Sequence, residues 1–124
     1  MSVYKFNSLV FSFHFFMLLS FQFMICYNIT IKIDPQIEQE WIRWQREEHI
    51  PEVMASKLFS DYKFFKLLEQ EESEGITYVV QYFSSSIGNY KKYINDFAPL
   101  LREKAFAKWG NRFVAFRTVM EVVN

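Results

Sequence analysis

Trp41-Ile-Arg-Trp-Gln-Arg-Glu-Glu-His-Ile-Pro-Glu-Val-Met54 is the stretch around which the rest of the chain can be arranged. It continues a run of large apolar side chains at positions i, i+4 and i+7, which share one face of a helix: Ile37, Trp41 and Trp44. Proline disfavours helical backbone at the residue before it, so the helix is predicted to stop near His49. Because proline is tolerated in the first turn of a helix, a second short helical piece is predicted to begin at Pro51. His49 would then lie at a kink between two helical pieces.

The segment before this helix alternates strictly between two sets of side chains, as a β-strand does. One set is apolar: Ile25, Tyr27, Ile29, Ile31 and Ile33. The other set is more polar: Cys26, Asn28, Thr30 and Lys32. Asp34 is predicted to end the strand and cap the helix, with Pro35 at the first helical position.

Three more strands and a second helical region are predicted after Met54. Residues 58–70 and 76–83 read as strands joined by a polar turn that ends at Gly75. A helix is predicted to end near Phe97, because Pro99 interrupts it, and a second piece runs from Pro99 to Trp109. Gly110 is a helix stop signal, and residues 113–123 read as the last strand.

The element order is therefore β-α-β-β-α-β within one α+β domain. This order is typical of the ferredoxin-like fold, a four-stranded antiparallel sheet with two helices on one face. Two helices cover only one face of the sheet, yet both phases of the last strand carry bulky apolar groups. Phe113 and Val119 belong to one phase, and Phe116 and Met120 to the other. An apolar face of this kind usually marks an interface, so a homodimer joined through the sheet face is expected.

Composition excludes several classes of protein. The chain of 124 residues has a formal net charge of zero and lacks the basic surface of a nucleic-acid-binding protein. One cysteine excludes an internal disulfide, and two histidines are too few for the usual zinc sites. The three glycines are too scattered for a phosphate-binding loop. We therefore expect no metal, no cofactor and no nucleic-acid partner, and we interpret Cys26 as an inert small hydrophobic residue.

Residues 1–23 differ from the rest, because they are rich in Phe, Ser and Leu and contain one Lys and no acid. One interpretation is a signal peptide or membrane anchor, although polar residues interrupt the apolar run and no small-x-small cleavage pair precedes Met24. A native extension is another. The preferred interpretation is that Met24 is the true start and residues 1–23 are a leader read in frame, which leaves a single domain over 24–124. We then expect a cytoplasmic protein with no membrane association of residues 24–124. A secreted or membrane-associated protein follows only if residues 1–23 are a signal or anchor.

Several unusual strings after residue 23 resemble one family. They are Met24-Ile-Cys-Tyr-Asn-Ile-Thr-Ile-Lys-Ile-Asp34, Trp41 to Met54, Leu67-Leu-Glu-Gln70 with Gly75-Ile-Thr-Tyr78, and Gly110-Asn-Arg-Phe-Val-Ala-Phe-Arg-Thr118. In this order they look like the bacterial family of domain of unknown function 4286. That family's fold is similar to the dimeric α+β barrel group, which includes small monooxygenases, isomerases and haem-degrading proteins. The resemblance implies that fold and a dimer, and it names no activity.

His49 is the candidate catalytic residue. The helix end and the nearby carboxylates could hold it as an imidazolium or position it as a general acid or base. The alternative is that His49 completes the helix end by bonding a backbone carbonyl. The candidate ligand-binding residues are predicted to converge with His49 between helices and sheet: Asn28, Trp41, Gln81 and Arg117. The alternatives are that Trp41 is a core residue and that Arg117 reaches solvent or pairs with an acid.

Three functions remain open at this point. In the first, a small dimer binds an apolar or aromatic small molecule in its helix–sheet cleft near His49. In the second, the domain is a non-catalytic structural or protein-interaction module without a ligand. In the third, it is a cofactor-free monooxygenase or isomerase that uses His49 as general acid or base. The sequence does not identify a substrate.

Overall fold

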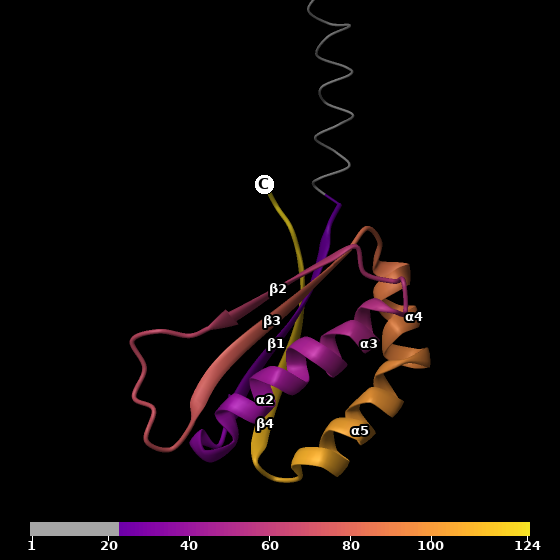
Figure 1. Ribbon diagram of the computed structural model, residues 1–124. Helices are drawn as coiled ribbons and strands as arrows, with labels where there is room; N and C mark the ends of the chain where they lie inside the picture. The colour runs from indigo at the N-terminus through magenta and orange to yellow at the C-terminus, as the bar shows by residue number, and fades with distance from the viewer. Residues whose placement is uncertain (1–22) are drawn as a thin grey trace, which may run out of the picture.

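A computed structural model describes residues 23–124 (Figure 1). The predicted leader, apart from Phe23, lies outside the described residues. The described elements follow one another as β1 (Ile25–Ile33), η1 (Pro35–Ile37), α2 (Glu38–Trp44), η2 (Gln45–His49), α3 (Ile50–Met54), β2 (Asp61–Lys66), β3 (Ile76–Ser84), α4 (Ile87–Asp96), α5 (Ala98–Trp109) and β4 (Phe113–Glu121).

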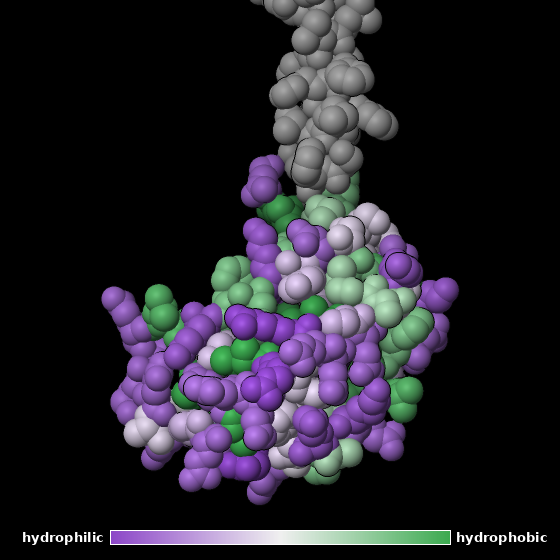
Figure 2. All heavy atoms as spheres, in the orientation of Figure 1, coloured by the Kyte–Doolittle hydropathy of each residue, from purple (hydrophilic) through white to green (hydrophobic). Residues whose placement is uncertain are grey.

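The four strands form one antiparallel sheet in the order β2-β3-β1-β4. The helices pack on one side of this sheet (Figure 1). This confirms the predicted ferredoxin-like α+β fold, in which the first and third strands are central. The helices turn a largely hydrophilic surface outward, with hydrophobic side chains scattered over it (Figure 2).

The core lies between the helices and the inner face of the sheet. The apolar phase of β1 faces inward as predicted, and Tyr27, Ile29, Ile31 and Ile33 are all buried. The helices contribute large side chains that pack on these strands: Ile37, Trp41, Trp44, Ile50, Val53, Tyr93, Leu101 and Trp109. Burial of apolar surface on this scale is the main force that holds the helical layer to the sheet.

The first helical region begins as predicted. The Asp34 carboxylate accepts a hydrogen bond from the Gln36 N–H at 2.9 Å, and Pro35 occupies the first turn. The Arg112 side chain also donates to Asp34, at 3.1 Å, which ties the start of this region to the start of β4.

The predicted helix end at His49 is wrong. The backbone stays helical through His49 and Ile50, and a π-helical turn, η2, joins α2 to α3. In this turn the Ile50 N–H donates to the Gln45 carbonyl, five residues back. Pro51 has no N–H, and in an α-helix its ring would crowd the Glu47 carbonyl. The wider π-turn relieves that crowding without ending the helix.

The second helical region agrees with prediction. α4 ends at Asp96, and Pro99 lies in the first turn of α5. α5 ends at Trp109 and is capped by Gly110, whose φ of +59° favours glycine. Strand β2 is shorter than the predicted 58–70. It ends at Lys66, because β2 is an edge strand and the chain turns away soon afterwards through Glu69, with φ of +57°.

Candidate functional site

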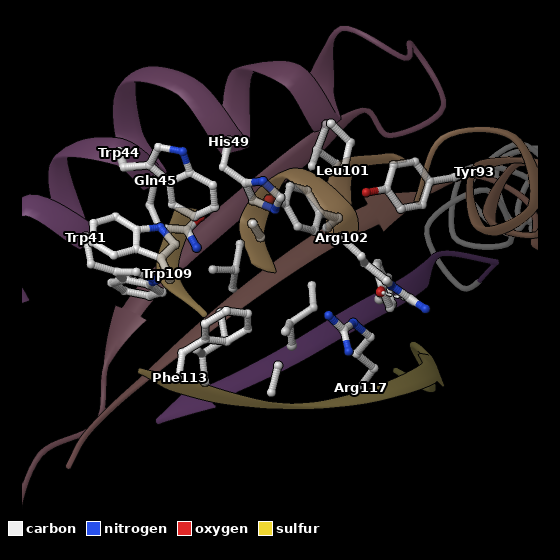
Figure 3. A pocket seen from close by; sticks show the side chains of 18 residues that line it. Trp41, Trp44, Gln45, His49, Tyr93, Leu101, Arg102, Trp109, Phe113 and Arg117 are labelled. Carbon is white, nitrogen blue, oxygen red and sulfur yellow. Dashed lines mark hydrogen bonds between the residues drawn. The ribbon is translucent and has the colours of Figure 1, made fainter. Parts of the chain in front are cut away.

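A pocket lies between the inner face of the sheet and the helices α2, η2, α3 and α5 (Figure 3). It encloses about 580 Å³ of atom-free space, counted to its open mouth, of which only about 50 Å³ can hold the centre of a water molecule. The pocket is therefore narrow: its interior holds a few water molecules, and a ring can enter only where the lining side chains move apart, since a cavity that binds benzene measures about 150 Å³.

One end of the pocket is aromatic. Trp41, Trp44, Trp109 and Phe113 line it. Trp44 and Trp109 meet edge to face, with ring centroids 5.8 Å apart, and so bridge the first helix to α5. Edge-to-face and stacked contacts of this type are the geometry by which aromatic pockets hold a further ring.

His49 lies on the helix side of the pocket, and its ring points toward the sheet (Figure 3). The imidazole stacks on Trp44, with ring centroids 4.7 Å apart and the planes 23° apart. Burial lowers the pKa of His49 to about 4. That value is the net result, because Glu52 raises the pKa and the charges of Arg117 and Lys104 lower it. His49 is therefore neutral at pH 7 and not the imidazolium considered from the sequence.

Three buried polar atoms of the pocket lining have no hydrogen-bond partner within residues 23–124. They are the Gln45 Oε1, the Tyr82 hydroxyl and the Trp109 Nε1. Their side chains are only 3%, 2% and 7% exposed, respectively. Burial raises the pKa of Tyr82, which therefore keeps its proton and can donate. All three residues line the pocket, and their unpaired atoms are an acceptor, a hydroxyl and an N–H donor.

Two arginines line the pocket away from its tryptophans. Figure 3 shows Arg102, from α5, and Arg117, from β4, on the side of the pocket away from the labelled tryptophans. Arg102 donates to the Tyr27 hydroxyl at 3.1 Å. Both arginines are exposed, and neither forms a salt bridge within the described part of the chain.

The structure brings together three of the five residues singled out in the sequence. His49, Trp41 and Arg117 line one pocket, whereas Asn28 and Gln81 do not. Strand alternation is the reason, because Asn28 lies beside the inward-facing Ile29 and so points to the opposite face. There the Gln81 Nε2 donates to the Asn28 Oδ1 at 3.2 Å, and Asn28 donates to Thr30 at 3.3 Å.

Four pocket residues were missed: Gln45, Tyr82, Arg102 and Trp109. Gln45 carried a readable signal, since it follows Trp41 by four residues and precedes His49 by four on a face that is otherwise apolar. Tyr82 and Trp109 read as ordinary core residues. Cys26 is buried on the outer sheet face between Phe83 and Met120, and burial raises the pKa of its thiol.

Neither a metal cluster nor a membrane-spanning helix is found in the described chain. No three His, Cys, Asp or Glu side chains of residues 23–124 are grouped as metal ligands would be. Over the same residues, no helix has the length and apolar character needed to cross a bilayer.

The sheet order and the one-sided helical layer define a ferredoxin-like α+β protein. The chain belongs to the family described as domain of unknown function (DUF4286), which matches residues 24–123. No curated protein matches it.

Three solved structures illustrate this fold. A conserved protein from Methanosarcina mazei Go1 is similar, with TM-score 0.64 and 13% identity, over 84% of this chain and 97% of that one. A dimeric ferredoxin-like protein from an uncultured marine organism has TM-score 0.63 and 12% identity, over 82% of this chain and 96% of that one. SnoaB from Streptomyces nogalater, a cofactor-independent oxygenase, has TM-score 0.53 and 9% identity, over 79% of this chain and 91% of that one. At these identities the likeness concerns the fold alone.

Proposed function

We propose that the domain binds a small apolar or aromatic molecule in the helix–sheet pocket, against Trp41, Trp44 and His49. The observation that carries this proposal is the set of three unpartnered buried polar atoms on the pocket wall. Each buried donor or acceptor left unpaired costs roughly 1–3 kcal/mol. A protein with a total stability of about 5–15 kcal/mol rarely keeps three such groups together without a use for them.

A purely structural module is the weaker explanation. In a domain that served only its own fold, apolar residues in place of Gln45 and Tyr82 would fill the space and remove the unpaired groups. Water can satisfy these atoms in the free protein, and the 50 Å³ open to water centres is enough for a few molecules. A ligand that offers its own polar group would replace that water.

Cofactor-free catalysis at His49 is the second candidate. A neutral imidazole with access to a pocket can take a proton from a bound molecule, which is the first requirement of a general base. The likeness of fold to a cofactor-independent oxygenase is consistent with this candidate. The aromatic pocket is needed for either activity, so binding is the function to test first.

We also propose that the protein is a cytoplasmic homodimer joined through the helix-free sheet face. That face exposes several large apolar side chains: Phe65, Val114, Phe116 and Met120. Asn28 and Gln81 lie among them, and each amide carries both a donor and an acceptor. Such groups can pair with their own copies across a two-fold axis, which favours a second copy of the chain as the partner.

The pocket proposal is tested by a thermal-shift screen of small aromatic compounds on the full chain, repeated with Gln45→Met and His49→Ala. A ligand present at 100 times its Kd should raise the melting temperature by roughly 10 °C. Gln45→Met should raise the melting temperature of the free protein, because it removes an unpaired buried oxygen, and should weaken the ligand response. The matched control is Gln39→Met, an exposed glutamine of α2. A screen without hits, together with no stability gain in Gln45→Met, would contradict the proposal.

A further inference from the structure

Among residues 23–124, the two pocket arginines have no acidic partner in a salt bridge. Arg117 projects from β4 opposite Ile29, on the inner face of the sheet, and Arg102 projects from α5 toward the same space (Figure 3). Glu52, the acid that acts on His49, is already held by Lys104 at 2.7 Å. The cationic part of the pocket is therefore not neutralised by a salt bridge within residues 23–124.

We infer that the ligand is a small aromatic carboxylate, with its ring among the tryptophans and its carboxylate on Arg102 and Arg117. This inference rests on the proposed ligand-binding function and names its ligand class. A guanidinium group presents paired N–H donors that match the two oxygens of a carboxylate. Two guanidinium groups beside one aromatic slot match a molecule with one anionic group and one ring.

The arrangement of the pocket explains why the anion and the ring take different ends. A carboxylate is costly to bury without a charged partner, and both arginines retain contact with water. The buried end offers Trp41, Trp109 and Phe113, which favour a flat apolar group.

The inference is tested by isothermal titration of the full chain with three acids and their uncharged amides. The acids are benzoate, phenylacetate and 1-naphthoate, and the amides are benzamide, phenylacetamide and 1-naphthamide. At least one acid should bind about tenfold more tightly than its amide, because charge-assisted hydrogen bonds are about twice as strong as neutral ones. Added salt should reduce this preference.

Variants connect the preference to the arginines. Arg117→Met should abolish the preference for the acid by weakening acid binding about tenfold more than amide binding, and Arg117→Lys should retain part of the preference, since lysine keeps the charge and loses the paired geometry. Arg112→Met is the control, because Arg112 is exposed and bonded to Asp34 outside this pocket. Circular dichroism checks that each variant is folded.

The outcomes separate this inference from the proposed function. Equal binding of acid and amide, unchanged in Arg117→Met, would overturn the anionic ligand class and leave a pocket for neutral ligands. Failure of all three acids to bind would also overturn it, and the proposed function would then depend on neutral hits in the thermal-shift screen. A preference for the acid that persists in Arg117→Met and Arg102→Met would show that the anion binds elsewhere.

Discussion

The charge state of His49 depends on residues from three separate elements. Burial beneath Trp44 disfavours the imidazolium, and the positive charges of Arg117 from β4 and Lys104 from α5 act in the same direction. Only Glu52, one turn further along the helix, opposes them. A bound carboxylate would add negative charge beside the ring and would therefore make protonation of His49 easier.

His49 should make the free protein less stable as the pH falls from 6.5 to 4. Above its ordinary pKa of 6.5 the imidazole is neutral whether the chain is folded or unfolded. Between 6.5 and 4 the unfolded chain binds a proton that the folded protein does not, so acid favours unfolding. Between pH 7 and pH 4.5 wild type should lose roughly 2 kcal/mol more than His49→Gln, because one pKa unit is about 1.4 kcal/mol. Urea unfolding of both proteins at several pH values measures this difference.

His49→Gln is the internal reference here, because glutamine does not titrate and all other groups are shared. Parallel stability curves for the two proteins over this pH range would mean that His49 is reached by water and titrates near its ordinary pKa. In that case the imidazole would not be the neutral group that the pocket requires.

Sequence reasoning located some of the pocket residues and not others, for a physical reason. His49, Trp41 and Arg117 stand out locally, as a histidine beside a proline, a tryptophan at helical spacing and an arginine in an apolar strand. Tyr82 and Trp109 matter to the pocket because each carries a buried polar atom without a hydrogen-bond partner among residues 23–124. That property depends on how β3 and α5 pack together, and no local pattern records it.

At the scale of elements, the π-helical turn η2 joins α2 and α3, whose buried faces would not line up along one regular α-helix. Trp41 and Trp44 are buried before it, Gln45 is buried at its first residue, and Ile50 and Val53 are buried after it. From Gln45 to Ile50 is five residues, one more than an α-helix needs to return to the same face. The extra residue is accommodated by the π-turn, which also places His49 beside Gln45 at the pocket.

Deletion of Glu47 should be tolerated by the fold. The deletion shortens the interval from Gln45 to Ile50 to four residues, so a regular α-helix would keep both buried faces in place. We expect a loss of roughly 3 kcal/mol in the free energy of unfolding, because the regular α-helix again crowds the Pro51 ring against the carbonyl four residues back. Ligand binding should fall more than stability, because His49 changes its position relative to Gln45. Urea unfolding and the thermal-shift response measure the two effects.

Deletion of Arg43, which is also exposed, is the matched control. It removes a residue from regular α-helix and rotates Ile37 and Trp41 away from Trp44 by about 100°. This protein should fail to fold or lose most of its stability. Similar stability for the two deletions would show that η2 is not an inserted residue between two fixed faces.

The element boundaries illustrate where local signals suffice. Asp34-Pro35 and Gly110 were placed correctly, because capping and positive φ are properties of the residues themselves. The predicted stop at His49 was wrong, because a proline signal cannot tell a broken helix from a widened one. The burial of Ile50 and Val53 decides whether the helix breaks or widens.

At the scale of the whole molecule, the two faces of the sheet have different tasks. The inner face supports the pocket, and the outer face carries exposed apolar side chains around the bonded pair Asn28 and Gln81. The sequence indicated this division, because both phases of the last strand are apolar while the helices can cover only one face. In β4, Arg117 and Phe116 are neighbours in sequence that belong to different faces.

Phe116→Lys should therefore convert the proposed dimer to a monomer without unfolding it. Phe116 is 67% exposed on β4, so the change costs the single chain little, whereas a dimer joined through this face would bury two lysines against apolar surface. The dimer Kd should rise by about 100-fold or more. Phe106→Lys is the control, because Phe106 is 66% exposed on α5, in the helical layer. Sedimentation at micromolar concentration should give twice the chain mass for wild type and Phe106→Lys, and the chain mass for Phe116→Lys. A wild-type protein that sediments as a monomer would remove the sheet-face dimer and leave the pocket proposal intact.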